Sequence, residues 1–577
     1  MCATMVDEWV RIGVDVAMVA PGSRSTPMAL ALVAHPGMST HVFIDERVAS
    51  FAAVGAARVL RRPIIMLCTS GTAATEFHSA VVEAHQSDVP LIVITADRPP
   101  ELRNVGAPQT IDQIDLYGTA VRRFVDLGVA DPAQRSEWRR SARNLVSDAT
   151  GLRPGPVHVN MPFREPLLGE AQELPAVESG SESGLDFRTP LATDATVREA
   201  WRIMSFAPKG HSRGVIIAGE GADDVAEVAG GSSAVLELAR MLGWPVWADP
   251  RSGLRRPHPN VVAAADAILR DDAVAERLRP SVVLRFGTLP ASKVVGTWLR
   301  EWGCPQVCVT AGPQLADPDR LVTHHVVGEC ADVARRLAAL CAGASGDSGL
   351  DPDWLHQWMA ASVAADLAIA TTVSTGRLTE PGVAHVVVRD APAPGVLVAS
   401  SSMPVRDVEW YGAPRNGVKI VANRGANGID GVMSSAIGAA LVARVPVTLI
   451  IGDVAFLHDS GALVGLAERA CDLRIVIVDN NGGAIFSFLP QASALSATVF
   501  ERLFGTPHTV DIELLARAHA VDYRAVGNHA ALSAALAESG PSIIHVRTER
   551  THVVADHDSV HRAVSDAVRD AVNLNRR

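Results

Sequence analysis

Two stretches, Val445–Asp453 (VPVTLIIGD) and Arg474–Gly483 (RIVIVDNNGG), decide the fold of this chain. Each reads as an apolar, β-branched strand that ends in polar residues, and we predict a helix over 462–471 between them. Continuous apolar strands are typical of a parallel sheet covered on both faces. A right-handed crossover would then bring Asp453 and Asn480 to the ligand-binding edge of an open α/β sheet.

The residues at these two strand ends suit a divalent cation and a phosphate. A carboxylate, an amide oxygen and the carbonyls of a glycine-rich turn offer the oxygen ligands that Mg²⁺ prefers when phosphate completes its coordination. The glycines let the backbone approach the phosphate closely. Gly-Asp and Asn-Asn-Gly-Gly are also ordinary turn sequences. The two together, with Asp453 and Asn480 27 residues apart, favour the cation site.

Composition indicates a large, well-packed globular protein. The chain has 577 residues, 48% of them hydrophobic and 20% charged, which suggests about three domains. The net charge of −11 argues against nucleic acid as a partner. No apolar run reaches the length of a membrane span, and residues 1–14 read as an amphipathic helix rather than a signal peptide. Seven scattered cysteines indicate reduced thiols and a cytoplasmic protein.

Strands and helices alternate along the whole chain. In the first third, strands at 16–20, 42–44, 64–67 and 91–94 alternate with helices such as 49–60 and 75–86. We therefore predict an α/β fold of three doubly wound parallel-sheet domains, at 1–170, 195–345 and 354–577. Residues 171–194, rich in Gly, Ser and Glu, read as a linker. The first and third domains look like two versions of one design.

The central domain opens with a strand and Gly219-x-Gly221, which invites a dinucleotide-binding interpretation. A third glycine should stand at position 224, where the chain has Asp224. A Rossmann-like domain without a bound nucleotide is therefore the better prediction.

Charged residues follow several predicted strands. Glu46 by position alone reads as a surface carboxylate that pairs with Arg47. Arg24, Arg98, Arg406 and Arg424 would each, taken singly, be surface ion pairs or struts. Four arginines on strand-end loops are better explained by substrates that carry carboxylates, because a guanidinium group binds a carboxylate through two hydrogen bonds.

Five segments carry a family resemblance. They are PGSRSTP (21–27), IDER (44–47), TADRPPEL (95–102), NRGANGIDG (423–431) and NNGGAIF (480–486). Together with Gly452-Asp453 they resemble the thiamin-diphosphate enzymes, and within them the synthases of menaquinone biosynthesis. One position departs from the diphosphate-binding motif of the class, which has glycine where this chain has Val454.

The resemblance implies thiamin diphosphate and Mg²⁺ (or Mn²⁺) as cofactors, with 2-oxoglutarate and isochorismate as substrates. It gives Glu46 the hydrogen bond to the aminopyrimidine ring and Ile429 the support of the bent coenzyme. It places Gly452, Asp453, Asn480 and Gly482 at the diphosphate, and the last three at the metal. Substrate positions carry over to Ser23, Arg24, Arg98, Gln109, Lys293, Ser402, Arg406, Arg424, Ile485 and Phe486. A homodimer or homotetramer follows, with the coenzyme between subunits.

Three alternatives remain at this point. The nearest is another thiamin-diphosphate enzyme, such as an acetohydroxyacid synthase or a simple 2-oxoacid decarboxylase, although neither explains so many arginines at strand ends. A flavin or nicotinamide oxidoreductase would use the central domain, which the incomplete glycine fingerprint opposes. An inactive regulatory subunit is disfavoured because Glu46, Asp453 and Asn480 are all present.

Overall fold

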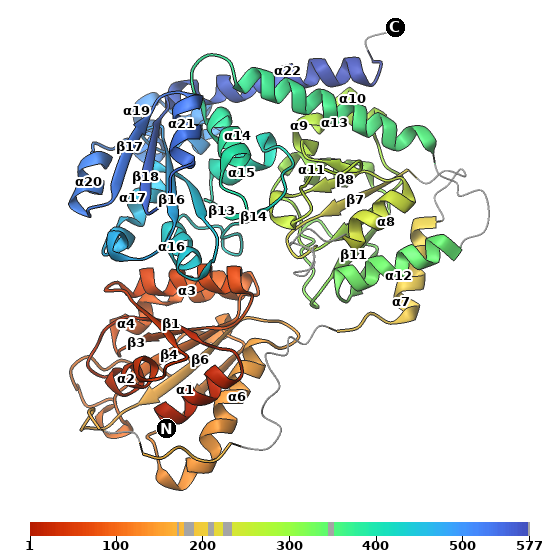
Figure 1. The fold of residues 1–577 in the computed structure, drawn as a ribbon. Helices are drawn as coiled ribbons and strands as arrows, with labels where there is room; N and C mark the ends of the chain where they lie inside the picture. Colours follow the sequence, from red (N-terminus) through yellow and green to blue (C-terminus); the bar gives the residue numbers. More distant parts are fainter. Residues whose placement is uncertain (170–171, 178–189, 206–212, 223–232, 344–350, 575–577) are drawn as a thin grey trace. The chain divides into compact units, whose positions relative to one another are not determined.

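The computed structural model describes residues 1–169, 172–177, 190–205, 213–222, 233–343 and 351–574. Three six-stranded sheets follow one another along the chain, each with flanking helices (Figure 1). The strand pairs with an assigned register are parallel, which confirms the predicted α/β class of three doubly wound sheets. Most of the predicted linker at 171–194, and Asp224, lie outside the described residues.

The first sheet has the order β2-β1-β3-β4-β6-β5. Its strands are β1 (Val16–Val19), β2 (Ser39–Val42), β3 (Ile64–Cys68), β4 (Leu91–Asp97), β5 (Arg123–Asp126) and β6 (Pro156–Pro162). Its helices are α1 (Cys2–Arg11), α2 (Thr26–Ala34), α3 (Glu46–Leu60), α4 (Thr72–Glu76), α5 (His78–Gln86) and α6 (Trp138–Ala149). The four inner strands are buried throughout, because apolar residues on both of their faces are covered.

The central sheet has the order β12-β11-β10-β7-β8-β9. Its strands are β7 (Gly214–Ala218), β8 (Val246–Ala248), β9 (Val261–Val262), β10 (Val282–Phe286), β11 (Gln306–Thr310) and β12 (His324–Val327). Its helices are α7 (Asp194–Ser205), α8 (Ala234–Leu242), α9 (Ala265–Leu269), α10 (Asp272–Arg277), α11 (Lys293–Trp302) and α12 (Cys330–Gly343). Counted from its own first strand, this is the 3-2-1-4-5-6 order of Rossmann folds, as predicted.

The third sheet has the order β14-β13-β15-β16-β18-β17. Its strands are β13 (Gly395–Ala399), β14 (Val418–Val421), β15 (Val447–Gly452), β16 (Leu473–Asp479), β17 (Asp522–Val526) and β18 (Ser542–Arg547). Its helices are α14 (Glu380–Asp390), α15 (Met403–Tyr411), α16 (Val432–Val442), α17 (Asp453–His458), α18 (Gln491–Ala494), α19 (Ala497–Phe500), α20 (Ile512–Ala518), α21 (His529–Leu536) and α22 (Val553–Ala571), and α13 (Pro352–Val373) packs against α22. Strand for strand, this order repeats that of the first sheet, as predicted.

The chain divides into two compact units. The first comprises Met1–Arg188, Asn423–Arg444 and Ala455–Leu473, and the second comprises Thr189–Ala422, Val445–Val454 and Arg474–Arg577. Inside the first unit, α16 packs directly on α3. Glycines permit this close approach, because a Cβ on Gly55 would lie 1.8 Å from the carbonyl oxygen of Ser435.

Three predicted elements differ from those observed. The helix predicted over 462–471 is absent: α17 begins directly at Asp453, and two 3-10 turns, Ser460–Leu463 and Leu466–Glu468, follow it. Gly465, with φ of 72°, stands in a left-handed conformation between these turns and interrupts the helix.

The strand predicted over 42–44 is also displaced, because β2 ends at Val42. Asp45 caps α3 by accepting a hydrogen bond from the backbone N–H of Val48, so Glu46 is the first residue of that helix. The helix predicted over 75–86 is divided into α4 and α5.

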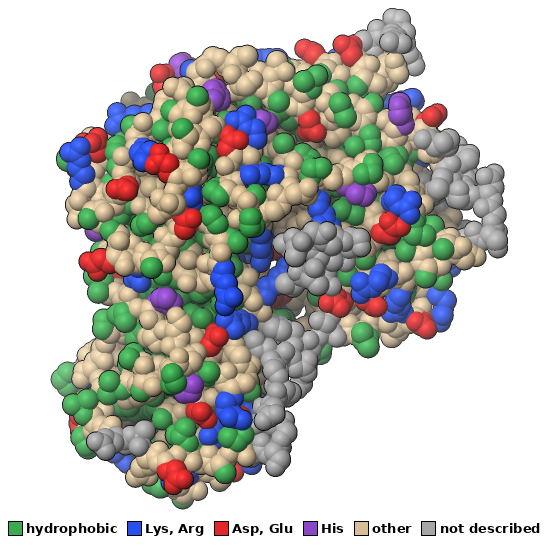
Figure 2. Space-filling model, in the orientation of Figure 1, with side chains coloured by type: hydrophobic (Ala, Val, Ile, Leu, Met, Phe, Trp, Pro, Cys, Tyr) green, Lys and Arg blue, Asp and Glu red, His purple; other side chains and the backbone are tan. Residues whose placement is uncertain are grey.

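Basic and acidic side chains are interspersed on the face drawn in Figure 2, without a broad field of one sign. Among the helices of the described chain, none is both long and apolar enough to cross a membrane.

His158 makes the first unit sensitive to acid. It is buried on β6, and its Nε2 is 2.8 Å from the hydroxyl of Thr95, while its Nδ1 is buried without a hydrogen bond from the described residues. Burial lowers the pKa of His158 to about 3. The unfolded chain takes up a proton near pH 6.5 whereas the folded protein does not, so stability falls with decreasing pH until about pH 3.

We therefore expect His158→Gln to flatten the acid dependence of unfolding. Between pH 6.5 and pH 5, titration of one such histidine removes about 2 kcal/mol from the free energy of unfolding. The melting temperature of the wild type should fall more steeply over this range than that of the variant, as measured by calorimetry. Parallel pH profiles would contradict the buried neutral histidine.

Candidate active site

An acidic cluster with one histidine lies at the ends of β15 and β16 in the second unit. Asp453 is almost fully buried, and its Oδ2 accepts a hydrogen bond from the backbone N–H of Gly482 at 2.7 Å. His508 Nε2 lies 3.2 Å from the same oxygen and 3.8 Å from Asp479 Oδ1. Burial and the charge of Asp479 raise the pKa of Asp453, against the N–H groups of Gly482 and Val454. Val454 therefore contributes a backbone donor even though it replaces the glycine of the motif.

The loop after β16 leaves no room for side chains. Gly482 has φ of 136°, and a Cβ there would lie 1.9 Å from the carbonyl oxygen of Gly505. The backbone N–H of Gly483 donates to the same carbonyl at 2.8 Å. The loop thus packs closely against Gly505, and the backbone N–H of Gly482 donates to Asp453.

Asn480 presents an oxygen without a donor. Its Nδ2 donates to Glu380 Oε1 at 2.8 Å, whereas its Oδ1 is buried and accepts no hydrogen bond from the described residues. A buried polar atom without a partner is destabilising, so it points to a ligand. The carboxylate of Asp453 and the free amide oxygen of Asn480 are hard donors, and they fit a cation such as Mg²⁺.

A buried polar cluster lies behind Asn480. It comprises Glu380, Asp407 and His557, whose potential ligand atoms lie within 4.8 Å of one another. His557 Nε2 is 2.8 Å from Asp407 Oδ1. Burial and the charge of Asp407 raise the pKa of Glu380 to about 7, against the opposing effects of His557, Asn480 and Thr548. The cluster connects Asn480 to α15, which carries Arg406.

The turn from β13 into α15 is strained. Ser402 has φ of 74°, an uncommon value for a residue with a side chain, and it precedes the first turn of α15. Arg406 NH1 donates to the carbonyl of Ser402 at 2.5 Å. β13 and β15 flank the point where the strand order of the third sheet reverses. The turn after β13 and Asp453 after β15 therefore both lie at this point of the sheet.

The predicted apolar residues of this site follow the glycine loop. Ile485 and Phe486 lie in the 3-10 helix Ala484–Phe488, and both are half-buried. The ring of Phe486 packs against that of Phe504 with centroids 5.3 Å apart.

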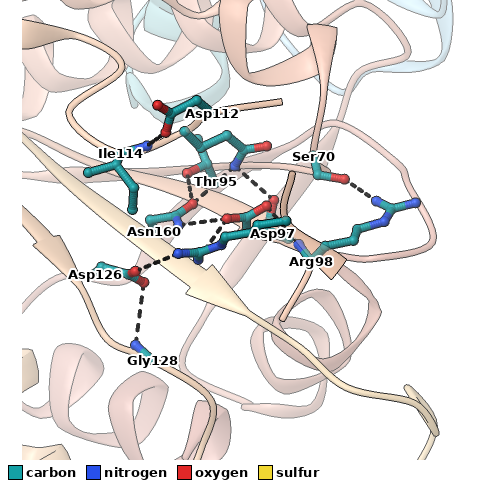
Figure 3. A network of polar contacts seen from close by, with 12 residues as sticks. Ser70, Thr95, Asp97, Arg98, Asp112, Ile114, Asp126, Gly128 and Asn160 are labelled. Atoms are coloured by element: carbon teal, nitrogen blue, oxygen red, sulfur yellow. Dashed lines mark hydrogen bonds and ion pairs between the residues drawn. The ribbon is translucent and has the colours of Figure 1, made fainter. Parts of the chain in front are cut away.

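A second polar edge lies in the first unit, at the ends of β1, β3 and β4. Arg98 donates to the hydroxyl of Ser70, and Figure 3 shows the two side chains pointing toward one another. Burial and the charge of Arg24 lower the pKa of Arg98, which indicates that the two guanidinium groups are close. Gln109, with φ of 56°, donates from Nε2 to the carbonyl of Ser70 at 3.1 Å. Ser23 is exposed on the loop of Arg24.

Asp97 holds this edge in place. It is buried at the end of β4, accepts a hydrogen bond from Asn160 Nδ2 at 3.0 Å, and forms an ion pair with Arg103 at 2.8 Å (Figure 3). Its Oδ1 also accepts from the backbone N–H of Arg98 at 2.7 Å. The backbone that carries Arg98 is therefore fixed from the sheet.

Arg47 is not the partner that the sequence suggested for Glu46. Its guanidinium group contacts the backbone carbonyl of His458 at 3.3 Å and Asp459 Oδ1 at 3.5 Å. Glu46 is half-buried at the start of α3. Burial raises the pKa of the Cys68 thiol, and the nearby charge of Glu46 raises it further. The surface ion pair that would have explained Glu46 structurally is therefore not formed with Arg47.

The loop of Arg424 is clamped by a buried carboxylate. Glu83, on α5, accepts hydrogen bonds from the backbone N–H groups of Gly425 at 3.0 Å and Ala426 at 2.7 Å. It also accepts from Arg58 NH2 at 2.8 Å. Glu83 thus fixes the backbone that leads from Arg424 to Ile429 within the first unit.

Lys293 lies apart from the other predicted residues of the second unit. It is the first residue of α11 and lines a cavity of about 400 Å³ formed by residues of 289–319. None of the other predicted site residues lines this cavity.

Comparison with known proteins gives the class. Residues 3–116 match the family described as thiamine pyrophosphate enzyme, N-terminal TPP binding domain. Residues 189–398 match the middle domain of thiamine pyrophosphate enzymes, and residues 409–546 match their C-terminal TPP binding domain. The three sheets and these matches define a thiamin-diphosphate enzyme.

Curated relatives narrow the class. A protein of Listeria monocytogenes is 37% identical over 98% of this chain and 97% of its own, and one of Geobacillus kaustophilus is 39% identical over 96% of each. One of Chloroflexus aurantiacus is 39% identical over 97% of this chain and 95% of its own. All three are named 2-succinyl-5-enolpyruvyl-6-hydroxy-3-cyclohexene-1-carboxylate synthase. The chain belongs to this synthase family, which confirms the resemblance seen in the sequence.

Sequence reasoning missed Glu83, Glu380 and His508. A signal existed for the first two, because each acid stands among apolar residues of a helix, in Ala80–Ala84 and Glu380–Val388. An acid at a buried helical position needs a partner. No signal in the sequence linked His508 to Asp453.

The glycine loop yields a test. Gly482→Ala would force a Cβ onto the carbonyl of Gly505 and move the loop away from Asp453. We expect the affinity for thiamin diphosphate to fall at least about tenfold, measured by calorimetric titration with Mg²⁺ present. Gly527→Ala is the control, because a Cβ there meets nothing within 4 Å. Equal affinities in both variants would show that the loop does not bind the coenzyme.

Proposed function

We propose that this protein releases CO₂ from 2-oxoglutarate and adds the remaining four-carbon fragment to isochorismate. The product is 2-succinyl-5-enolpyruvyl-6-hydroxy-3-cyclohexene-1-carboxylate, an intermediate of menaquinone biosynthesis. The names of the relatives support the reaction. One structural observation carries it for this chain: Arg406 and Asp453 follow β13 and β15, the strands that flank the reversal of the third sheet.

The proposal assigns thiamin diphosphate and Mg²⁺ (or Mn²⁺) to the end of the third sheet. Asp453, Asn480 and the backbone of Gly482 would hold the metal, and Gly452 would allow close approach of the diphosphate. The orphaned Asn480 Oδ1 supports the metal assignment. When bound, the coenzyme supplies the electron sink that loss of CO₂ from a 2-oxoacid requires. Ile429 would support the coenzyme, and the carboxylate of Glu46 would hold a proton at its aminopyrimidine ring.

The proposal assigns the carboxylates of both substrates to the arginines. Arg24 and Arg98 come from the first unit, together with Ser23 and Gln109, and Arg424 comes from the loop that Glu83 clamps. Arg406 and Ser402 come from the turn after β13. Ile485 and Phe486 would exclude water beside the substrate, and Lys293 would add a further cation. The active form would be a homodimer or homotetramer.

The decisive experiment measures CO₂ release. With saturating thiamin diphosphate and Mg²⁺, we expect rapid release from 2-oxoglutarate only when isochorismate is present, with one CO₂ for each isochorismate consumed. Pyruvate should replace 2-oxoglutarate poorly, because it lacks the distal carboxylate. Release that ignores isochorismate and accepts pyruvate equally would indicate a simple decarboxylase. Flavin absorption of the purified protein would indicate a different branch of the thiamin-diphosphate enzymes, such as the acetohydroxyacid synthases.

The arginines provide a second test. Charge-assisted hydrogen bonds contribute roughly 1.5–3 kcal/mol each, so Arg406→Ala and Arg424→Ala should each lower kcat/KM for a dicarboxylate on the order of 10²-fold or more. Lysine at either position should recover only part of this, because it is a point charge. Coenzyme affinity should change little.

The matched control is Arg517→Ala, which removes an exposed arginine that pairs with Glu513 within α20. Its kinetics should equal those of the wild type. If the variants at 406 and 424 also retain wild-type kcat/KM for both substrates, these arginines are struts and the assignment of substrate carboxylates to them is wrong.

A further inference from the structure

One end of the Asn480 amide is held by Glu380, which is not itself one of the proposed metal ligands. Its Nδ2 donates to Glu380 Oε1 at 2.8 Å, and both side chains are buried. The two ends of an amide are nearly equal in size but opposite in hydrogen bonding. A hydrogen bond at Nδ2 therefore turns Oδ1 away from Glu380, toward the side where it has no protein partner.

Glu380 is itself held firmly. It is the first residue of α14, which Thr379 caps through a hydrogen bond from the N–H of Gly382 at 3.3 Å. The hydroxyl of Thr548 donates to the same Oε1 at 3.3 Å. The His557–Asp407 pair packs beside it. The carboxylate thus meets Asn480 from a rigid, buried element.

We propose that Glu380 is a positioning residue for the divalent cation of the coenzyme: it fixes the amide of Asn480 so that Oδ1 faces the metal beside Asp453. This inference rests on the proposed function, because it assumes that the site takes a cation with thiamin diphosphate. Groups that orient a metal ligand from behind typically change metal affinity 10–100-fold when they are removed.

A purely structural role for the hydrogen bond leaves Oδ1 unexplained. An amide oxygen buried without a donor destabilises the fold. Glu380 accepts from both donors, and Asn480 Oδ1 is left buried without a partner among the described residues.

The test measures metal affinity directly. Mn²⁺ binding in the presence of thiamin diphosphate is followed by electron paramagnetic resonance for the wild type, Glu380→Met and Glu380→Gln. Methionine keeps the volume without a strong acceptor, so we expect Mn²⁺ affinity to fall at least about tenfold. Glutamine retains an acceptor and should recover most of it. At saturating Mg²⁺, kcat of Glu380→Met should return to within about threefold of the wild type.

Glu409→Met is the matched control, because Glu409 is another buried carboxylate of the second unit, on α15. It should lower the melting temperature without the loss of Mn²⁺ affinity. If Glu380→Met binds Mn²⁺ as tightly as the wild type, or if Glu409→Met loses as much affinity, Glu380 does not position the metal ligand.

Exchanging the amide and the carboxylate between positions 480 and 380 tests the proposal even if Glu380→Met fails to fold. Asn480→Asp keeps an oxygen for the metal, but it places the new carboxylate against that of Glu380, so Mn²⁺ affinity should fall. Adding Glu380→Gln to this variant places an amide donor beside the new carboxylate, and Mn²⁺ affinity should then rise at least about tenfold. No regain in the double variant overturns the inference. A wild type that binds neither Mn²⁺ nor thiamin diphosphate instead overturns the proposed function.

Discussion

The burial of a carboxylate and an amide at the ends of two neighbouring strands is the constraint on which the third sheet depends. Asp453 and Asn480 are both nearly inaccessible to water. Asp453 accepts from the backbone N–H of Gly482, whereas the amide of Asn480 is satisfied by the described residues only at Nδ2. Burial of a charge or a polar oxygen is unfavourable unless a partner satisfies it. The glycine loop after β16 and the buried cluster behind Asn480 supply the partners on the protein side. Asn480 Oδ1 is left without a partner among the described residues, and the proposed cation would supply it.

The first and third sheets share one strand order, yet they present different chemistry at the carboxyl ends of their strands. The third sheet offers oxygen donors from Asp453 and Asn480, whereas the first offers cations from Arg24 and Arg98. In the central sheet, with its Rossmann order, Glu220 follows β7 and pairs with Arg251 at 3.0 Å, and Lys293 lies beside a cavity. Identical topology therefore fixes where side chains emerge, and the loop residues decide what they bind.

Buried acids determine how the loops are held. Asp97, Glu83 and Glu380 each accept hydrogen bonds from a segment that carries a proposed ligand-binding residue. In each case the acid is located on a regular element and the segment that it holds follows a strand. Fixing the loop backbone in advance reduces the conformational entropy lost when substrate or coenzyme binds.

The sequence by itself determined the inner strands, the doubly wound class and the coenzyme class, because apolar runs and short strand-end motifs such as Gly452-Asp453 and Asn480-Asn481 are local signals. Only the tertiary structure decided which way the amide of Asn480 faces, since Glu380 is 100 residues away along the chain. It also decided that Arg47 turns to Asp459 rather than to Glu46, and that no helix spans 462–471. The physical reason is the same throughout. In a parallel sheet the crossovers bring together residues distant in sequence, and hydrogen-bond partners form only after these elements have packed.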